Sequence, residues 1–197
     1  LKYRTVFIGG GTPTVINYAM IGSIMSEIRS ELADDAEVSI ECNPGTVTAE
    51  SLKYYRSIGI NRLSIGLQAW QDTLLNKIGR IHSVDEFLET YENARKAGFE
   101  NINADLMFAL PGQTMDMWRE TVSNICSLGV EHISCYSLKL EEGTRLYDMK
   151  EKGLIVLPDE DLDREMYHYA VSVFEENGYA QYEISNFAKP GFRCLHN

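Results

Sequence analysis

One pattern recurs along the chain: an amphipathic helical stretch ends at a glycine, one apolar residue follows, and a short strand-like run comes next. It occurs four times, at Gly59-Ile60, Gly98-Phe99, Gly129-Val130 and Gly178-Tyr179. A glycine just past a helix adopts the left-handed conformation at little cost, and the apolar residue after it packs back on the last turn. Strands that alternate with helices in this way form βαβ units, so the pattern predicts an α/β fold with a parallel sheet.

Six strands follow one another in this series. We predict them at residues 4–9, 37–42, 62–68, 101–108, 132–138 and 181–186. Apolar residues at helical spacing fill most of the intervals, and residues 141–158 form an irregular excursion. Because no Pro- or Ser-rich linker divides the series, we expect one domain over residues 1–197.

Side chains alternate in character along these strands. Parallel strands that are covered on both faces normally read as continuous apolar runs. In residues 62–68, by contrast, Leu63, Ile65 and Leu67 alternate with small or polar residues. Since successive side chains point to opposite faces, the apolar set can pack on helices while the polar set faces the other way. A TIM-like (β/α) barrel with a polar interior therefore suits the sequence better than an open doubly wound sheet.

Composition excludes several classes of function. The formal net charge of -11 disfavours nucleic acid, which proteins bind largely through Lys and Arg. No apolar run approaches the roughly 20 residues of a membrane span, so we do not expect an integral membrane protein. The cysteines lack the short spacing of metal-binding loops, so we expect no metal site among them and a reducing, cytoplasmic location. They are Cys42, Cys126, Cys135 and Cys194.

Three consecutive glycines follow the first predicted strand, in Gly9-Gly10-Gly11-Thr12. Their backbone N–H and C=O groups are uncovered, which lets a ligand approach closely. The loop lacks the Gly-Lys-Ser/Thr of a phosphate-binding P-loop and the spaced glycines of the dinucleotide fingerprint. Two interpretations stay open from these residues alone: a ligand-binding loop, and a tight turn between a strand and a helix.

Hydrogen-bonding side chains stand at the carboxyl ends of successive predicted strands. Glu41, Gln68 and Asp105 occupy three such ends, and Arg80 follows the third strand. The carboxylates accept from amines and hydroxyls and Arg donates to carboxylates, so the set suits a zwitterionic, ribose-bearing ligand. Each residue alone is as well explained by a helix cap or an ion pair. Their repetition at equivalent strand ends indicates a binding site, because active sites of (β/α) barrels lie there.

Five blocks of the sequence resemble, in order and spacing, those of the oxygen-independent coproporphyrinogen III oxidase-like family of radical S-adenosylmethionine (SAM) proteins. The blocks are FIGGGTPT at 7–14, IECNPGT at 40–46, NRLSIGLQ at 61–68, GRIH at 79–82, and DLM at 105–107 with LPGQT at 110–114. The resemblance implies a partial TIM-like barrel of the radical SAM type with about six parallel strands.

Some of these blocks favour one branch of that family. NPGT at 43–46, GRIH at 79–82 and the ending YEISNF at 182–187 look more like the heme-chaperone branch, HemW, than the oxidase. The branch implies a protein that binds a [4Fe–4S] cluster, SAM and heme, receives electrons from a donor, and delivers heme to an acceptor protein. The alternative is the oxidase, which decarboxylates the propionates of coproporphyrinogen III. Enzymatic activity therefore stays undecided at this point.

The resemblance also implies roles for residues. Its SAM-binding positions correspond to Gly10, Gly11, Thr12, Glu41, Gln68, Arg80 and Asp105. His196 is the candidate heme ligand, because it begins what resembles the branch's His-Asn-x-x-Tyr-Trp motif and imidazole is a common axial ligand of heme iron. We expect His82, His132 and His168 at the surface or in packing, and we assign no catalytic residue.

One part of the family pattern is absent from the chain. The Cys-xxx-Cys-xx-Cys loop, which supplies three thiolates to the [4Fe–4S] cluster, would precede Leu1. We therefore expect a radical SAM core fragment that is truncated at both ends and lacks the first strand of the barrel. Such a fragment would hold no cluster and would not cleave SAM on its own.

Overall fold

The computed structural model, which describes residues 2–197, contains one seven-stranded sheet in the order β1-β2-β3-β4-β5-β7-β6. The first five strands are parallel and follow the chain order, while β7 is antiparallel to both β5 and β6. The strands are β1 (Tyr3–Ile8), β2 (Leu32–Cys42), β3 (Arg62–Gln68), β4 (Asn101–Phe108), β5 (His132–Ser137), β6 (Ala180–Gln181) and β7 (Asn186–Ala188).

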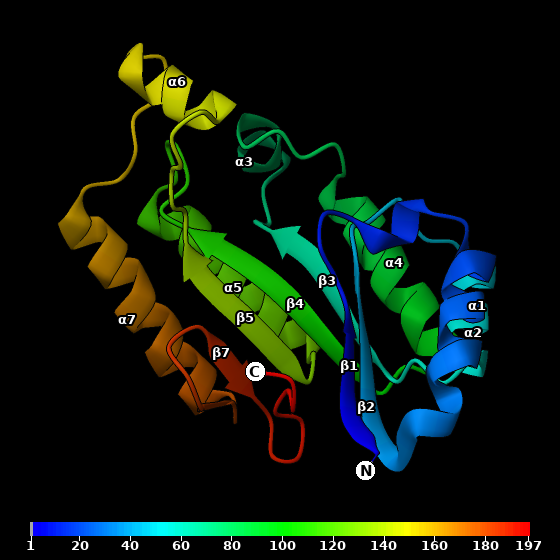
Figure 1. Cartoon of the computed structure of the whole chain (residues 1–197). Helices are drawn as coiled ribbons and strands as arrows, with labels where there is room; N and C mark the ends of the chain where they lie inside the picture. Colours follow the sequence, from blue (N-terminus) through cyan, green and yellow to red (C-terminus); the bar gives the residue numbers. More distant parts are fainter. Residues whose placement is uncertain (1) are drawn as a thin grey trace.

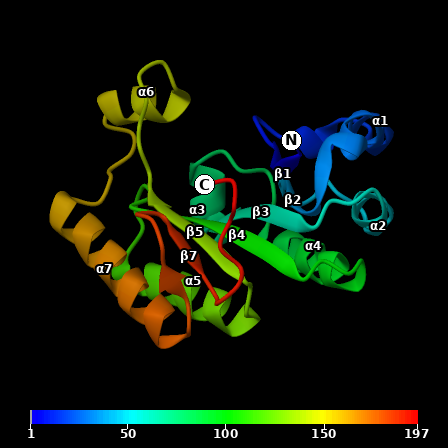
Figure 2. The same cartoon turned by 60° about the horizontal axis from the view of Figure 1, so that its bottom comes forward.

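Helices cover one face of this sheet. The α-helices are α1 (Tyr18–Ile28), α2 (Ala49–Ser57), α3 (Asp72–Lys77), α4 (Val84–Lys96), α5 (Met115–Leu128), α6 (Arg145–Glu151) and α7 (Glu160–Glu176). Figures 1 and 2 show α1, α2, α4, α5 and α7 on the outer side of the curled sheet, whereas α3 and α6 lie beyond the carboxyl ends of the strands. None of the helices in residues 2–197 is both long enough and apolar enough to cross a membrane.

Local sequence explains where several helices begin and end. Thr48 and Ser83 each form a capping box, in which the cap hydroxyl accepts from the third backbone N–H of the helix. Gly129 ends α5 at φ 72°, a left-handed conformation that glycine adopts without a steric penalty. The other three glycines of the recurring pattern also have positive φ, so the predicted helix ends are confirmed.

The sheet curls into a half-barrel, and its two faces differ as the alternation predicted. The apolar set packs under the outer helices in a core that includes Ile40, Leu63, Ile65, Ile102, Trp118, Ile125, Ile133 and Phe174. The opposite, concave face carries the polar set, and the C-terminal segment crosses it (Figure 2). The edge strands of the described sheet are β1 and β6.

The last predicted strand is wrong in extent and direction. Residues 181–186 do not form a sixth parallel strand; the chain makes two short strands, β6 and β7, around a turn at residues 182–185. The turn is stabilised by Ser185, whose N–H donates to the Glu183 carboxylate at 2.9 Å. The segment was misassigned because its alternation is that of a strand while its polar residues satisfy a turn. Five strands are therefore parallel rather than six.

Candidate functional site

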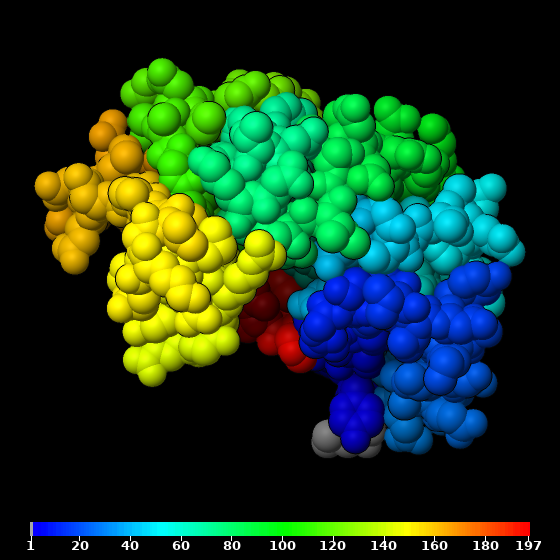
Figure 3. Space-filling view, turned by 90° about the horizontal axis from the view of Figure 1, so that it is seen from above, coloured from blue at the N-terminus to red at the C-terminus, as the bar shows by residue number. Residues whose placement is uncertain are grey.

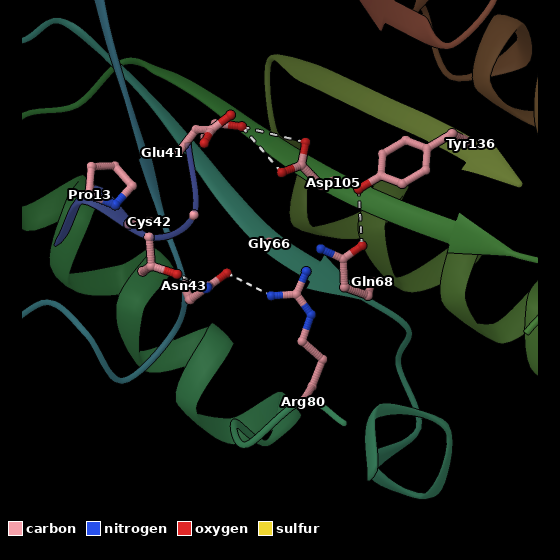
Figure 4. Close-up of a pocket in the computed structure, with 12 residues that line it drawn as sticks. Pro13, Glu41, Cys42, Asn43, Gly66, Gln68, Arg80, Asp105 and Tyr136 are labelled. Carbon is pink, nitrogen blue, oxygen red and sulfur yellow. Dashed lines mark hydrogen bonds between the residues drawn. The ribbon is translucent and has the colours of Figure 1, made fainter. Parts of the chain in front are cut away.

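The polar strand ends line one pocket at the carboxyl edge of the sheet (Figure 4). It contains six of the seven residues predicted to bind SAM: Gly11, Thr12, Glu41, Gln68, Arg80 and Asp105. The seventh, Gly10, lies beside them, since its N–H donates to Glu41 Oε2 at 3.1 Å. Asn43, Ser64, Gly66 and Tyr136 complete most of the remaining wall. The structure thus brings the predicted set together, while His196 lies elsewhere.

The glycine loop is shaped by the carboxylate behind it. A Cβ added to Gly9 would lie 2.9 Å from Glu41 Oε2 and 2.7 Å from the Phe7 ring, so a side chain there would have to displace the Glu41 carboxylate and the Phe7 ring. Gly10 and Gly11 have φ values of 90° and 66°, and a Cβ added to either would meet nothing within 4 Å. The left-handed backbone therefore favours glycine, and the space beside it is open to a ligand.

Asn43 joins the two sides of the pocket. Its Nδ2 donates to Thr12 Oγ1 at 2.8 Å, and its Oδ1 accepts from Arg80 Nη1 at 2.8 Å. The side chain of Arg80, which comes from the segment between α3 and α4, is thereby held against the end of β2 (Figure 4). One amide thus fixes both the glycine loop and the guanidinium group.

Gln68 adopts a strained backbone conformation at the end of β3. Its φ of 73° is in the left-handed region, and the pairing of β3 with β4 shifts register between Gly66 and Gln68. The side chain is 1% exposed, and its Oε1 accepts from the Tyr136 hydroxyl at 3.3 Å. A non-glycine residue in this region costs about 1–2 kcal/mol, and such strain clusters at functional sites.

Asp105 has a perturbed pKa in this pocket. The pKa of its carboxyl is raised from 3.8 to about 6, chiefly by burial and also by the nearby charge of Glu41, while hydrogen bonds from Asn103 and Ser134 and the charge of Arg62 work in the opposite direction. Asn103 Nδ2 donates to Oδ1 at 2.7 Å, and Ser64 lies 3.4 Å from both carboxylate oxygens. A partly protonated carboxyl beside a second carboxylate is an arrangement that functional pockets favour.

A hydrogen-bond chain leads from Asp105 to the C-terminal segment. Tyr182 Oη accepts from the Cys194 N–H at 3.3 Å, so its own proton is donated to His132 Nε2 at 2.7 Å. His132 therefore carries its proton on Nδ1, which donates to Asn103 Oδ1 at 2.6 Å. Burial, and then the charge of Arg62, lower the pKa of His132 to about 3. The imidazole is neutral near pH 7 and orients Asn103 toward Asp105.

The C-terminal segment forms the floor of the concave side. Leu195 N–H donates to Glu37 Oε1 at 3.1 Å, and Asn197 Nδ2 donates to Tyr182 Oη at 3.1 Å. The His196 ring stacks on Phe7 with centroids 4.9 Å apart and an angle of 18°. Seen from the carboxyl ends of the strands in Figure 3, the red C-terminal residues fill the bottom of a hollow between the blue N-terminal part and the yellow α6 region.

The other histidines and the cysteines lie in packing or at the surface. His82 is buried and within 3.3 Å of the Leu67 carbonyl, and His168 is exposed. All four cysteines are free thiols, and burial raises the pKa of Cys126 to about 11. No group of three His, Cys, Asp or Glu side chains in residues 2–197 is arranged to hold a metal ion.

Sequence reasoning missed several residues that build the site. Tyr136 ends the polar row of β5, and the same alternation that found Asp105 could have found it. Asn43 was part of a quoted block but received no role. His132 was expected in packing, and it is buried, but its part in the hydrogen-bond chain depends on Tyr182, 50 residues away, which no local signal shows.

The half-barrel and the polar pocket at the carboxyl ends of its strands define a radical SAM domain. Residues 1–125 match the sequence profile of the radical SAM superfamily, and the chain belongs to that superfamily. It is similar to the heme chaperone HemW of Bacillus subtilis (strain 168), with 44% identity over 98% of this chain and 52% of the relative. The mitochondrial radical S-adenosyl methionine domain-containing protein 1 of Danio rerio is 38% identical over 100% of this chain and 45% of that protein.

Solved structures agree with this assignment. The coproporphyrinogen III oxidase HemN of Escherichia coli, described as a radical SAM enzyme, superposes with a TM-score of 0.83 and 26% identity, covering 95% of this chain and 44% of that one. Elp3 of Methanocaldococcus infernus shares the fold, with a TM-score of 0.73 and 20% identity over 85% of this chain and 44% of its own. The chain spans about half the length of the curated relatives it matches.

Membership of the superfamily implies SAM and a [4Fe–4S] cluster as cofactors. The pocket fits SAM in kind: Glu41 and Asp105 offer acceptors for an amine or hydroxyls, Arg80 offers donors for a carboxylate, and the open glycine loop offers backbone groups. The cluster does not fit among the described residues, because they contain no suitable group of ligands. Thiolates from elsewhere would have to supply it.

Proposed function

We propose that this chain is the SAM-binding core of a heme chaperone. The observation that carries the proposal is the similarity to HemW heme chaperones along almost the whole chain, at 44% identity in the Bacillus subtilis relative. When bound, the cluster would supply electrons to SAM, and heme would be carried to an acceptor protein. Residues 1–197 would form one domain of that protein, and the free thiols support a location in the cytoplasm.

The SAM site would use the seven residues gathered at the strand ends. Glu41 and Asp105 would accept from the amine and ribose of SAM, Arg80 would donate to its carboxylate, and the Gln68 amide would donate to the remaining acceptors. Gly10, Gly11 and Thr12 would contribute backbone groups. The support for these roles is the pocket at the strand ends and the donor and acceptor set that lines it.

Calorimetric titration of SAM into the complete natural protein that contains this chain, with its cluster reconstituted, tests the site. We expect Asp105→Ala and Gln68→Ala to weaken SAM binding about tenfold or more, since each removes a buried hydrogen-bonding group. Asp161→Ala on the exposed surface of α7, where the side chain is 93% exposed, is the matched control and should bind SAM as the natural protein does. If both pocket variants bind SAM with the affinity of the natural protein, the proposed SAM site is wrong.

The second candidate function is oxidative decarboxylation of coproporphyrinogen III. The superposition on the Escherichia coli oxidase favours it, with a TM-score of 0.83. Hemin titration of the complete natural protein, alongside an anaerobic assay for protoporphyrinogen, discriminates the two. We expect stable hemin binding and no formation of protoporphyrinogen. Formation of protoporphyrinogen without stable hemin binding would favour the oxidase function over the chaperone function.

A further inference from the structure

The guanidinium group of Arg62 is buried in the concave interior and makes no hydrogen bond to another side chain of residues 2–197. Arg62 is 2% exposed, and its Nε makes no hydrogen bond. None of the ion pairs among residues 2–197 includes it. Burying a charge is costly unless it is paired, so a bound anion could stabilise this buried cation.

The residues beside Arg62 on the two neighbouring strands also have polar atoms without hydrogen-bond partners. Arg62 is in register with Ser39 on β2 and with Asn101 on β4. Ser39 Oγ and Asn101 Oδ1 lack hydrogen-bond partners as well. The three belong to the interior face, because Glu41, Ser64 and Asn103 lie two residues further along the same strands and line the interior cavity. Three neighbouring positions on β2, β3 and β4 thus hold hydrogen-bond donors on Arg62 and Ser39 and an acceptor on Asn101 that are not used within the protein.

Arg62 lines a cavity that adjoins the SAM pocket. The cavity has a volume of about 290 Å³, and Asn103, Ser134 and Asn186 contribute hydrogen-bonding groups to its wall. It shares Glu41 and Asp105 with the pocket of Figure 4, so the two spaces are neighbours. Its volume lies at the lower end of the range for small-molecule sites, which suits an arm of a ligand rather than a whole macrocycle.

The chemistry of the cavity selects an anion at its Arg62 end. Glu41 and Asp105 already accept hydrogen bonds, from Gly10 and from Asn103, and their charge repels an anion from their end. Arg62 presents a planar array of donors, which matches the two oxygens of a carboxylate. A carboxylate there would give a hydrogen-bond partner to the buried Arg62 guanidinium, which has none among residues 2–197.

We propose that Arg62 anchors a carboxylate arm of the porphyrin that the protein handles. The proposal rests on the proposed function, since heme and coproporphyrinogen both carry propionate arms. The candidate iron ligand His196 stacks on Phe7, which lines the cavity, and its neighbour Asn197 lines the cavity too. The porphyrin would therefore be held by its carboxylate on the floor of the concave side and by its iron at the C-terminal segment.

Hemin and hemin dimethyl ester, which lacks free carboxylates, test the anchor in the complete natural protein. We expect Arg62→Gln to weaken hemin binding about tenfold to a hundredfold, as for the loss of a charge-assisted hydrogen bond, and to leave binding of the ester within about twofold. The natural protein should prefer hemin over the ester by a similar factor. Arg4→Gln, at a side chain that is 71% exposed, is the control and should change neither affinity.

The alternative is that Arg62 only balances the interior charges of Glu37, Glu41 and Asp105. In that case Arg62→Gln would lower the melting temperature and leave the hemin-to-ester ratio at its natural value, which overturns the anchor. Equal losses for hemin and ester would overturn it too. If the natural protein binds SAM but neither hemin nor its ester, both the proposed heme binding and the anchor at Arg62 are wrong. If it binds hemin with an affinity that Arg62→Gln does not change, only the anchor is wrong.

Discussion

Asp105 is a buried carboxyl group beside a second carboxylate, and its ionisation should weaken the fold. Its pKa is about 6 in the folded protein against an ordinary 3.8, so the folded protein binds the proton more tightly than the unfolded chain does. The destabilisation is absent below about pH 4 and complete above about pH 6. Asp105→Asn cannot ionise, so its free energy of unfolding relative to the natural chain should rise by about 2 kcal/mol between pH 4 and pH 7. Urea unfolding across that pH range measures this difference in the free energy of unfolding, with Asp161→Asn as the exposed control. A difference between Asp105→Asn and the natural chain that does not change with pH would show that the Asp105 carboxyl is not buried as described.

Tyr182 links the C-terminal segment to the interior through one hydroxyl group. Tyr182→Phe would leave His132 Nε2 and the Cys194 N–H without their partner. We expect a loss of about 1–3 kcal/mol in the free energy of unfolding, because buried groups would be left unsatisfied. Tyr3→Phe, at a residue that is 62% exposed, should change the stability little. Long-range ¹H–¹⁵N spectra should show the His132 proton on Nδ1 in the natural chain; a proton on Nε2 would rule out the proposed direction of the chain.

At the scale of the elements, the bulged end of β3 is the strained point of the sheet. Because Gln68 has a φ of 73°, Gln68→Gly should be more stable than Gln68→Ala by about 1 kcal/mol. Ser64 stands on the same strand in a regular pair with Asn103, so the order should reverse there, with Ser64→Ala more stable than Ser64→Gly. Chemical denaturation of the four variants checks the pair of comparisons. The same order at both positions would show that the turn at Gln68 is unstrained.

The elements also show what the sequence could predict. The helix ends at glycine and the polar interior face followed from local rules, since backbone conformation and side-chain direction depend on few residues. The reversal of the chain between β6 and β7 did not follow, because it depends on pairing with β5, about 50 residues earlier. The strand ends of the pocket were found by repetition, and the same alternation marks the position of Tyr136. Asn43 gains its role only from the Arg80 side chain, which a distant segment brings to it.

For the whole molecule, the C-terminal segment connects the two halves of the half-barrel. It contacts Glu37 on β2 and Tyr182 after β6, which lie toward opposite edges of the sheet. The hydrogen-bond chain from Tyr182 then reaches Asp105 at the carboxyl edge. Any ligand that moves the segment would therefore alter the surroundings of the pocket at the strand ends, which would give the chain a physical route between the proposed porphyrin site at His196 and the proposed SAM site.

The absence of a ligand set for the cluster within residues 2–197 leads to a prediction about iron content. The four free thiols are spread over the fold, and burial raises the pKa of Cys42, Cys126, Cys135 and Cys194, which keeps them as thiols rather than the thiolates that bind cluster iron. After anaerobic reconstitution, the 197-residue chain should therefore hold far less than four iron and four sulfide ions per chain. The Escherichia coli coproporphyrinogen III oxidase, prepared in parallel and described as a radical SAM enzyme, is the positive control. A stoichiometric cluster in the 197-residue chain would mean that these thiols can be gathered and ionised, and the buried positions described for them would be wrong.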